Sequence, residues 1–437
     1  MLFPCRSPTL ALSTILLPHL LASAPVHVLL STELFYPDLP GGLMRFFRYG
    51  PGLVERGIQP EVITLQHRPE LPLTETVNGI RIHRFTPPNA APAPEQRPWL
   101  LQQALARAQT LRQQGKRAVL QPAMLSHRMV PTLLQAKLAG IPAVHNFSLA
   151  PEVPVRPPGL KRFRQWLHMS LLLAPFDRLV FLSREQHRLY RKYGLIRANA
   201  VRHIPNGVNL ERFRPVRDEA ERRQLRAEHG FGKEDQIVLF VGGVMERKGV
   251  DILLEAWNDV TRRHPRAVLA VVGSEAGRIS HQRPGYQEKL ASYLERLDEL
   301  RSRLERPESV RFLGERDDPA PFYRLADLFA FPSRREGLPN AVLEAMACGL
   351  PCLVAHFDGM PHDGEELGWN GRHHLSLGHT PREWAESLTT WLDPQRREAR
   401  QNLALEARRW IESTHPLPRV LDAWADLYHT CHSSQRS

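Results

Sequence analysis

Cysteine is scarce in this sequence, with four residues among 437: Cys5, Cys348, Cys352 and Cys431. None of them forms a Cys-x-x-Cys pair or stands beside a histidine at the spacing of metal ligands. The pattern excludes a disulfide framework and a structural zinc site, and it suits a reducing compartment. The predicted loops also contain no Asp-x-Asp metal motif. We therefore expect no metal site.

Long apolar runs are also missing. The one candidate, residues 10–21, is shorter than the roughly 20 residues that cross a bilayer, and Pro18 interrupts it. Arg6 before this run and the small residues 22–24 after it resemble a secretory signal peptide. A disordered extension and a misassigned start are the alternatives. In each case residues 1–24 are expected to be an N-terminal extension rather than part of a domain.

Carboxylates are sparse in the first half of the chain, and none occurs between Glu95 and Glu152. Residues 1–199 hold 24 Lys and Arg against 10 Asp and Glu, whereas residues 200–437 hold 34 against 36. The net charges are therefore +14 and −2. This asymmetry indicates two domains with different partners, of which the first meets an anionic one. We do not expect a nucleic acid, because no nucleic-acid-binding motif is present.

Apolar runs of four to six residues alternate with helical stretches along most of the chain. Such runs are typical of parallel strands that helices cover on both faces. Two such series predict an α/β fold of two facing Rossmann-like, doubly wound domains, with ligands at the carboxyl ends of the strands. The expected parts are the extension (1–24), an N-terminal domain (25–198), a C-terminal domain (199–375) and C-terminal helices (376–437). The expected strands are 26–31, 61–64, 117–121, 142–146, 177–183, 236–241, 267–272, 310–313, 328–331 and 351–355.

The stretch 334–351 carries the clearest chemical signal. A loop holds Glu336, Pro339 can open a helix because its missing N–H would have no partner there, and Gly349 can end that helix. The first-turn N–H groups of such a helix form an anion site at the positive end of its dipole. Glu336 and Glu344 would flank the site and accept hydrogen bonds from sugar hydroxyls. Solvated glutamates on an amphipathic helix are the alternative.

Two further signals stand at predicted strand ends. Gly242 and Gly243 follow the first strand of the C-terminal domain and let the backbone approach a ligand. Arg247 and Lys248 come next, and they can place cations on a diphosphate. His145 ends a strand of the N-terminal domain and would face the cleft. A solvated basic pair and a packed core histidine are the alternatives.

The run 336–351, the segment Pro205–Asn209 with Phe213, and the pair Gly41–Gly42 together resemble the retaining glycosyltransferases of family 4. The run matches the Glu-x7-Glu motif of that family, the segment matches its hinge, and the glycine pair matches its N-terminal glycine loop. The resemblance covers residues 26–430. It implies the GT-B architecture of two facing Rossmann-like domains.

The resemblance implies a role for each matching residue. Glu336 would contact hydroxyls of the transferred sugar, and Glu344 would hold the ribose. Residues 337–340 would offer N–H groups to the diphosphate, and Lys248 would neutralise the leaving phosphate. His145 would touch the sugar near the reaction centre. The implied catalytic residues are His145, Lys248 and Glu336. The implied donor-binding residues are Gly42, Gly243, Arg247, Lys248, Gly337, Leu338, Pro339, Asn340 and Glu344.

The sequence differs from the motifs of the family at two places. Gly243 stands where members usually carry arginine, and Arg247 is the candidate to supply that charge. The segment Asp358–His362 replaces the usual Asp-Val-Gly-Gly-Ile-Pro-Glu, which leaves the sugar and the base open. The first departure keeps a non-catalytic or weakly active glycan-binding relative as an alternative, and a GT-B sugar epimerase is another.

The resemblance implies a metal-independent hexosyltransferase without a cofactor. It would move a hexosyl unit from a nucleotide-diphosphate sugar, such as a UDP-sugar, to a saccharide or lipid-linked acceptor. The implied setting is the synthesis of cell-surface polysaccharide or lipopolysaccharide. Because nucleotide-sugars are cytosolic substrates, we expect a cytoplasmic protein.

The basic N-terminal domain suggests the acceptor side. Arg156, Lys161, Arg162 and Arg164 lead into the aromatic and apolar stretch 166–173. Such a stretch can lie on anionic lipid, with about 1 kcal/mol per basic residue near the surface. This predicts peripheral contact with the inner face of the plasma membrane. A normal domain helix with solvated arginines is the alternative.

Overall fold

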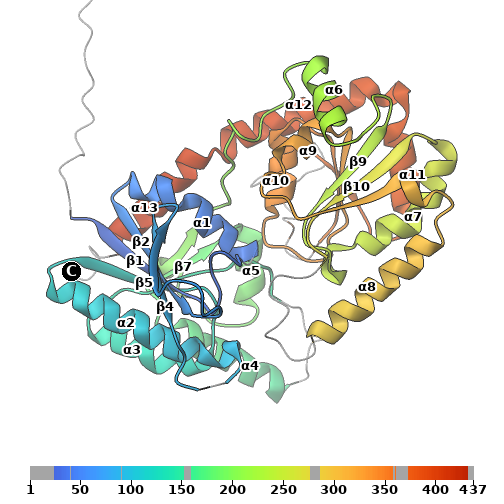
Figure 1. Cartoon of the computed structure of the whole chain (residues 1–437). Helices are drawn as coiled ribbons and strands as arrows, with labels where there is room; N and C mark the ends of the chain where they lie inside the picture. Colours follow the sequence, from blue (N-terminus) through green and yellow to red (C-terminus); the bar gives the residue numbers. More distant parts are fainter. Residues whose placement is uncertain are drawn as a thin grey trace, which may run out of the picture.

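The computed structural model describes residues 24–39, 41–89, 91–151, 159–275, 286–357, 360 and 373–431. The predicted extension apart from Ala24, the segment Asp358–His362 apart from Met360, and Arg156 lie outside these residues. The described chain forms two domains, each built around a largely parallel sheet, and C-terminal helices that reach both domains (Figure 1).

The N-terminal domain is organised around a sheet with the order β3-β4-β2-β1-β5, and β6-β7-β8 form a second sheet. A bridge between Leu120 and Ala143 joins the two sheets. All paired strands run parallel except β3 and β4, which the turn at Asn78 and Gly79 joins as a hairpin. The strands are β1 (Val26–Ser31), β2 (Ile58–Leu65), β3 (Thr74–Val77), β4 (Ile80–Phe85), β5 (Arg117–Pro122), β6 (Val144–Asn146), β7 (Arg178–Phe181) and β8 (Val201–His203). The helices are α1 (Gly41–Val54), α2 (Arg97–Gln113), α3 (Val130–Leu138), α4 (Leu160–Leu173) and α5 (Arg184–Arg191).

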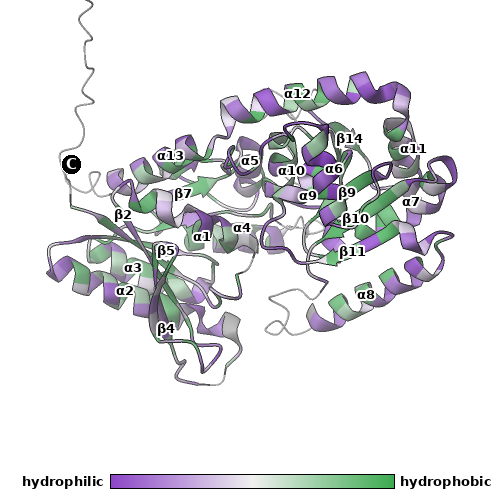
Figure 2. Cartoon of the chain, turned by 45° about the horizontal axis from the view of Figure 1, so that its top comes forward, coloured by the Kyte–Doolittle hydropathy of each residue, from purple (hydrophilic) through white to green (hydrophobic). Residues whose placement is uncertain are grey.

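The C-terminal domain is built on a parallel sheet with the order β11-β10-β9-β12-β13-β14. Its central strands are buried on both faces, which explains why they read as continuous apolar runs in the sequence. Figure 2 shows β9 and β10 as hydrophobic, whereas the surface helices α8 and α12 carry many hydrophilic residues. The strands are β9 (Gln236–Val241), β10 (Ala267–Val272), β11 (Val310–Gly314), β12 (Leu328–Phe331), β13 (Cys352–Ala355) and β14 (Leu375–Leu377). The helices are α6 (Glu219–Glu228), α7 (Val250–Arg263), α8 (Tyr286–Ser302), α9 (Ala320–Leu325) and α10 (Asn340–Ala347).

The C-terminal helices tie the domains together. They are α11 (Pro381–Leu392), α12 (Arg397–Thr414) and α13 (Leu417–Thr430). Helix α11 packs on α7 and α12 on α10, whereas α13 returns to the N-terminal domain and packs on α1 (Figure 1). At the crossing, Val208 pairs with Pro416 in a short parallel bridge.

The predicted α/β arrangement of two Rossmann-like domains with a helical tail is confirmed. Each predicted strand overlaps an observed one, but β3, β4, β8 and β14 were not predicted. None of the four is a continuous buried apolar run: β3, β8 and β14 are short and mostly exposed or half-buried, and β4 alternates apolar with polar residues.

No helix in the described ranges is both long enough and apolar enough to cross a bilayer.

Candidate active site

The loop between β12 and α10 presents main-chain N–H groups without an acceptor among the described residues. Within the described ranges, no acceptor takes a hydrogen bond from the N–H of Gly337, Leu338 or Asn340. Pro339 has no N–H to donate. Because α10 starts at Asn340, these groups stand at the positive end of its dipole. They can donate to an anion that enters the loop.

Glu336 is the centre of a buried ion cluster beside this loop. Its Oε1 lies 2.6 Å from Arg247 Nη1 and 2.7 Å from Lys248 Nζ. The hydroxyl of Ser333 donates to the same oxygen at 2.7 Å. Burial opposes ionisation of Glu336, but the charges of Lys248 and Arg247 outweigh it and hold the pKa of the carboxyl below its usual value. The ionised carboxylate therefore gathers two cations next to the N–H groups.

A glycine turn fixes the position of Lys248. Gly249 has a φ of +75°, and a Cβ there would lie 2.3 Å from the carbonyl oxygen of Pro332. The turn sets Lys248 Nζ 4.9 Å from the centre of the Phe331 ring. Burial lowers the pKa of Lys248 more than the carboxylate of Glu336 raises it.

Arg247 faces the site rather than solvent. Its Nη1 also donates to the carbonyl oxygen of Arg335 at 2.7 Å. The sequence left open whether Arg247 could replace the arginine that is missing at Gly243. The Arg247 guanidinium points toward Glu336 of the loop, as that role requires. A Cβ at Gly243 would meet the flexible end of Met245 at 3.2 Å, so this position accepts a side chain if the Met245 methyl group shifts by a few tenths of an ångström.

Glu344 receives a partner from each domain. Arg48 of α1 donates to its Oε1 at 2.8 Å, and Tyr323 of α9 donates to its Oε2 at 3.1 Å. Burial raises the pKa of Glu344 more than Arg48 lowers it. The second carboxylate of the motif thus lies where the two domains meet.

The predicted site residues Gly42 and Gly337 come from different domains, and both lie next to Ser148. The N–H of Ala150 donates to the carbonyl oxygen of Glu336 at 3.3 Å. A Cβ at Gly337 would lie 2.6 Å from Ser148 O, so glycine is required for this close approach. Gly42 lies on the other side of Ser148, where a Cβ would be 3.5 Å from Ser148 Oγ. The structure places Gly42 in the first turn of α1 rather than in a loop.

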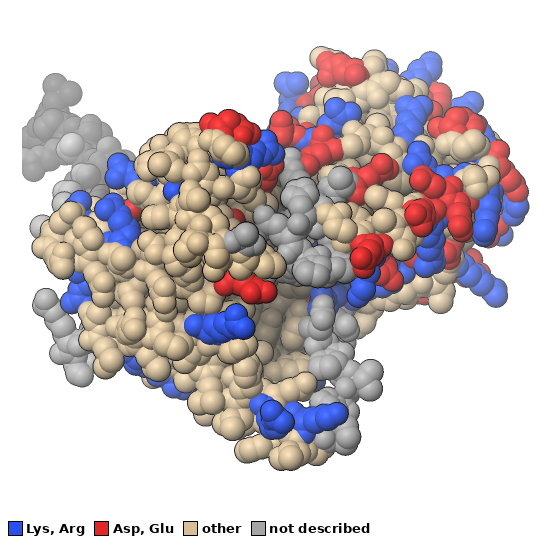
Figure 3. Space-filling view, turned by 60° about the horizontal axis from the view of Figure 1, so that its bottom comes forward, with Lys and Arg blue, Asp and Glu red and all other residues tan. Residues whose placement is uncertain are grey.

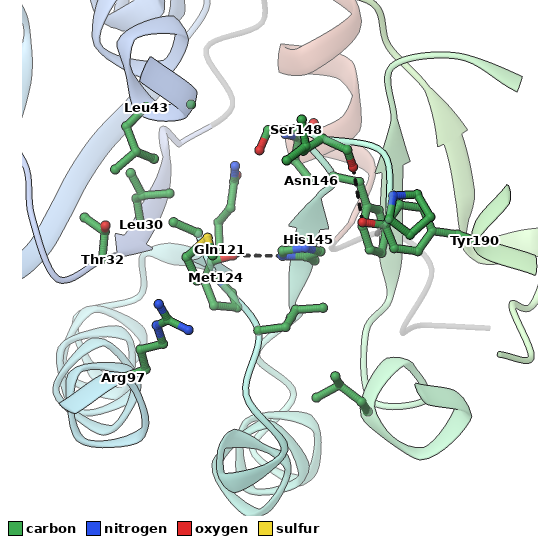
Figure 4. Close-up of a pocket in the computed structure, with 18 of the residues that line it drawn as sticks. Leu30, Thr32, Leu43, Arg97, Gln121, Met124, His145, Asn146, Ser148 and Tyr190 are labelled. Atoms are coloured by element: carbon green, nitrogen blue, oxygen red, sulfur yellow. Dashed lines mark hydrogen bonds between the residues drawn. The ribbon is translucent and has the colours of Figure 1, made fainter. Parts of the chain in front are cut away.

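A cavity of about 1080 Å³ opens on the N-terminal side of the cleft (Figure 4). Of the predicted site residues, Gly42 and His145 line it, whereas the predicted residues of the C-terminal domain do not. Helix α13 contributes Trp424 and Tyr428. Its basic lining residues are Arg45, Arg97, Lys161, Arg164 and Arg335.

His145 lies in the wall of this cavity, near Gln121 and Met124 (Figure 4). Its Nδ1 is 3.0 Å from the carbonyl oxygen of Pro122. Because a carbonyl can only accept, Nδ1 carries the proton and Nε2 has a free lone pair. Burial lowers the pKa of His145 to about 4, so the imidazole is neutral at physiological pH. The hydrogen bond of His145 goes to Pro122 and not to the Glu336 loop.

Arg45 and Arg48 of α1 were not among the site residues predicted from the sequence. Arg45 donates from Nη1 to Asn206 Oδ1 at 2.8 Å, and Asn206 in turn donates to the carbonyl oxygen of Leu338 at 2.7 Å. Burial lowers the pKa of Arg45. Arg45 and Arg48 are three residues apart, which puts them on one helical face. Two arginines at this spacing, shortly after Gly41–Gly42, were the feature of the sequence that could have indicated them as site residues.

No group of three or more His, Cys, Asp or Glu residues in the described ranges is placed to hold a metal ion.

Comparison with known proteins gives two family matches. Residues 41–207 match the glycosyl transferase 4-like domain, and residues 221–410 match glycosyl transferases group 1. A D-inositol 3-phosphate glycosyltransferase of Corynebacterium jeikeium is 35% identical over 195 residues, which are 43% of this chain and 42% of that protein. The chain spans about half the length of the curated relatives it matches.

Solved structures share the whole architecture. A sucrose-phosphate synthase of Thermosynechococcus elongatus superposes with a TM-score of 0.72 at 19% identity, over 94% of this chain and 100% of that one. The HepE protein of Anabaena, solved with UDP and glucose, superposes with a TM-score of 0.67 at 16% identity, over 92% and 99%. These likenesses confirm the GT-B fold. With both domains matched by glycosyltransferase families, the chain belongs to family 4 of the glycosyltransferases.

Proposed function

We propose that this protein is a retaining hexosyltransferase that uses a nucleotide-diphosphate sugar without a metal ion. The observation that carries the proposal is the set of unused N–H groups at Gly337, Leu338 and Asn340, beside the cations Arg247 and Lys248. Helix N-termini with cationic neighbours bind phosphate groups. The diphosphate of the donor would lie on these N–H groups.

The leaving group of the reaction is a nucleoside diphosphate, so catalysis needs positive charge where that charge develops. Lys248 and Arg247 already lie at the loop, held there by Glu336. A bound diphosphate would compete for both cations and release Glu336 toward the hydroxyls of the transferred sugar. Glu344, about one turn into α10, would accept hydrogen bonds from the ribose.

The proposed chemical step is a front-face substitution. The bond from the sugar C1 to the phosphate oxygen breaks, and the acceptor oxygen bonds to C1 on the same face. The proton of the acceptor hydroxyl goes to the leaving phosphate oxygen, so no nucleophile of the protein is required. His145 would accept a hydrogen bond at Nε2 from a sugar hydroxyl, because its Nδ1 already donates to Pro122.

The cavity of the N-terminal domain would hold the acceptor. It adjoins the loop through Arg335, Ser148 and Ala150, and its basic lining residues suit an anionic group on the acceptor. We propose a saccharide or lipid-linked acceptor in cell-surface polysaccharide or lipopolysaccharide synthesis, at the cytoplasmic face of the plasma membrane. The similarity to an inositol phosphate glycosyltransferase supports an acceptor with a phosphate, and HepE with UDP supports a uridine donor.

A panel of UDP-, GDP- and ADP-sugars tests the proposal. The purified protein is expected to release nucleotide from one class of donor, to the same extent with and without EDTA. The anomeric configuration of the product, read by NMR, is expected to match that of the donor. Nucleotide release that stops with EDTA would contradict metal independence, and an inverted product would contradict the front-face step.

A non-catalytic or weakly active glycan-binding relative is the second candidate, because Gly243 stands where the family usually has arginine. Under this alternative, saturating donor gives little or no nucleotide release with any base, while a glycan still binds. A sugar epimerase would instead convert the donor sugar itself without transferring it to an acceptor.

A further inference from the structure

Helix α4 exposes a row of large apolar side chains. Leu160, Phe163, Leu167 and Leu171 are 74%, 58%, 42% and 59% exposed. Their spacing of three and four residues puts them on one narrow face of the helix, which we call the α4 stripe. Single exposed apolar residues are ordinary, whereas a continuous row of them marks an interaction site.

The neighbouring face of α4 forms part of the cavity wall. Lys161, Arg164, His168 and Leu172 line the cavity. Each of these positions follows a residue of the α4 stripe by one, a rotation of about 100° around the helix. One helix thus carries the exposed stripe and a wall of the proposed acceptor cavity. The stripe therefore lies beside the cavity.

The surroundings of the α4 stripe are almost free of negative charge. Residues 96–176 contain eleven Lys and Arg and one carboxylate, Glu152. Figure 3 shows the contrast between the domains: the C-terminal domain mixes acidic and basic side chains, whereas the N-terminal domain presents broad uncharged areas with Lys and Arg and few carboxylates. Across the described ranges, no carboxylate pairs with Lys161, Arg162 or Arg164.

We propose that the α4 stripe docks on an anionic lipid bilayer. The four apolar side chains would enter the interface, and Lys161, Arg162 and Arg164 would lie against lipid phosphates. This inference rests on the proposed function and deepens it: the acceptor is lipid-linked, its headgroup reaches the cavity, and its lipid tail stays in the bilayer.

A second copy of this chain fits the stripe less well. A symmetric contact would bring the same patch of each copy together. The cations Lys161, Arg162 and Arg164 of one copy would then lie opposite the same cations of the other copy and repel them. Within the described ranges, α4 has no carboxylate to offset this repulsion. An anionic bilayer supplies the complementary charge.

Vesicle sedimentation of the full chain tests the inference. Wild-type protein is expected to sediment with vesicles of phosphatidylcholine and phosphatidylglycerol, and to be released by high salt. The variant Phe163→Gln/Leu167→Gln/Leu171→Gln, which changes only residues outside the cavity lining, is expected to bind at least about tenfold more weakly. Its control is Leu405→Gln. Leu405 is 54% exposed on α12, which lies on the opposite side of the molecule from α4 (Figure 1).

Nucleotide release without vesicles separates the two proposals. The triple variant and Leu405→Gln are expected to release nucleotide as the wild type does. Absence of release in every protein would overturn the proposed function whatever the vesicles show. Unchanged vesicle binding by the triple variant would overturn the docking proposal. A wild-type dimer that the triple variant converts to a monomer, measured by light scattering, would also overturn it in favour of self-association.

Discussion

The two sides of the cleft are built in different ways. On the C-terminal side, Glu336, Arg247 and Lys248 form a compact ion cluster beside unused N–H groups. On the N-terminal side, a large cavity is lined by basic and apolar residues from many segments, and an exposed apolar stripe lies beside it. This difference matches the proposed division of roles, with a small charged site for the donor diphosphate and a large site for the acceptor.

The comparison also shows how the domains depend on each other. Arg48 and Arg45 project from α1 of the N-terminal domain, and they bind Glu344 and Asn206 respectively. Side chains of the N-terminal domain thus contact the region that we propose as the donor site. Movement of one domain against the other would open these contacts, so closure of the cleft and completion of the donor site would occur together.

Loss of Lys248 is expected to have the largest effect. The variant Lys248→Ala removes a buried cation from the proposed leaving-group site, and nucleotide release is expected to fall by about 100- to 1000-fold, as for the loss of a preorganised donor. Steady-state rates with saturating donor measure this. Lys289→Ala, an exposed lysine of α8, is the matched control and should keep the wild-type rate. Equal rates for the wild type, Lys248→Ala and Lys289→Ala would contradict the assignment of the donor site to this cluster.

Loss of Arg48 tests the dependence of the donor side on the acceptor domain. Without it, Tyr323 is the hydrogen-bond partner that the side chain of the buried Glu344 keeps among the described residues, and the pKa of Glu344 is expected to rise further. A charged hydrogen bond contributes about 1.5–3 kcal/mol, so the donor KM is expected to rise by about 10- to 100-fold in Arg48→Ala. Arg81→Ala, which changes an exposed arginine of β4, is the control. A changed acceptor KM with an unchanged donor KM would contradict this division between the two sides.

The variant Gly243→Arg is expected to bind the donor more tightly than the wild type. The position accepts a side chain once the flexible end of Met245 shifts, and Arg247 already supplies one charge. An added guanidinium near the diphosphate is expected to lower the donor KM by about fivefold or less, since exposed ion pairs contribute about 0–1 kcal/mol. Gly243→Gln, of similar reach without the charge, is the control. A gain in both variants would show that charge is not the cause.

A last prediction concerns the pH dependence of stability, for which we expect the smallest effect on nucleotide release at neutral pH. The pKa of His145 is about 4 in the folded protein and about 6.5 when exposed, so between these values the unfolded state binds the proton more readily. The free energy of unfolding should therefore fall as the pH drops from about 6.5 to about 4, by up to about 1.4 kcal/mol per pH unit from this group. In His145→Asn this slope should be smaller, as measured by denaturant unfolding at several pH values. An identical slope would mean that His145 is hydrated in the folded protein.

The fold could be predicted from the sequence because its strands are continuous apolar runs, as in β10 and β12. The donor residues could be proposed for a similar reason, since Glu336 to Asn340 follow one another in a single loop. The acceptor cavity could not be predicted, because Arg45, Gln121 and Arg335 lie far apart in the chain and meet only in the folded protein. The pairing of Arg48 with Glu344 also depends on how the two domains pack.

The most direct test of the account is a crystal structure of the protein with a bound nucleoside diphosphate, starting with UDP. The account predicts diphosphate oxygens within hydrogen-bond distance of the N–H groups of Gly337, Leu338 and Asn340, with Lys248 turned toward them. A nucleotide bound instead in the N-terminal cavity, beside His145 and Tyr190, would contradict it.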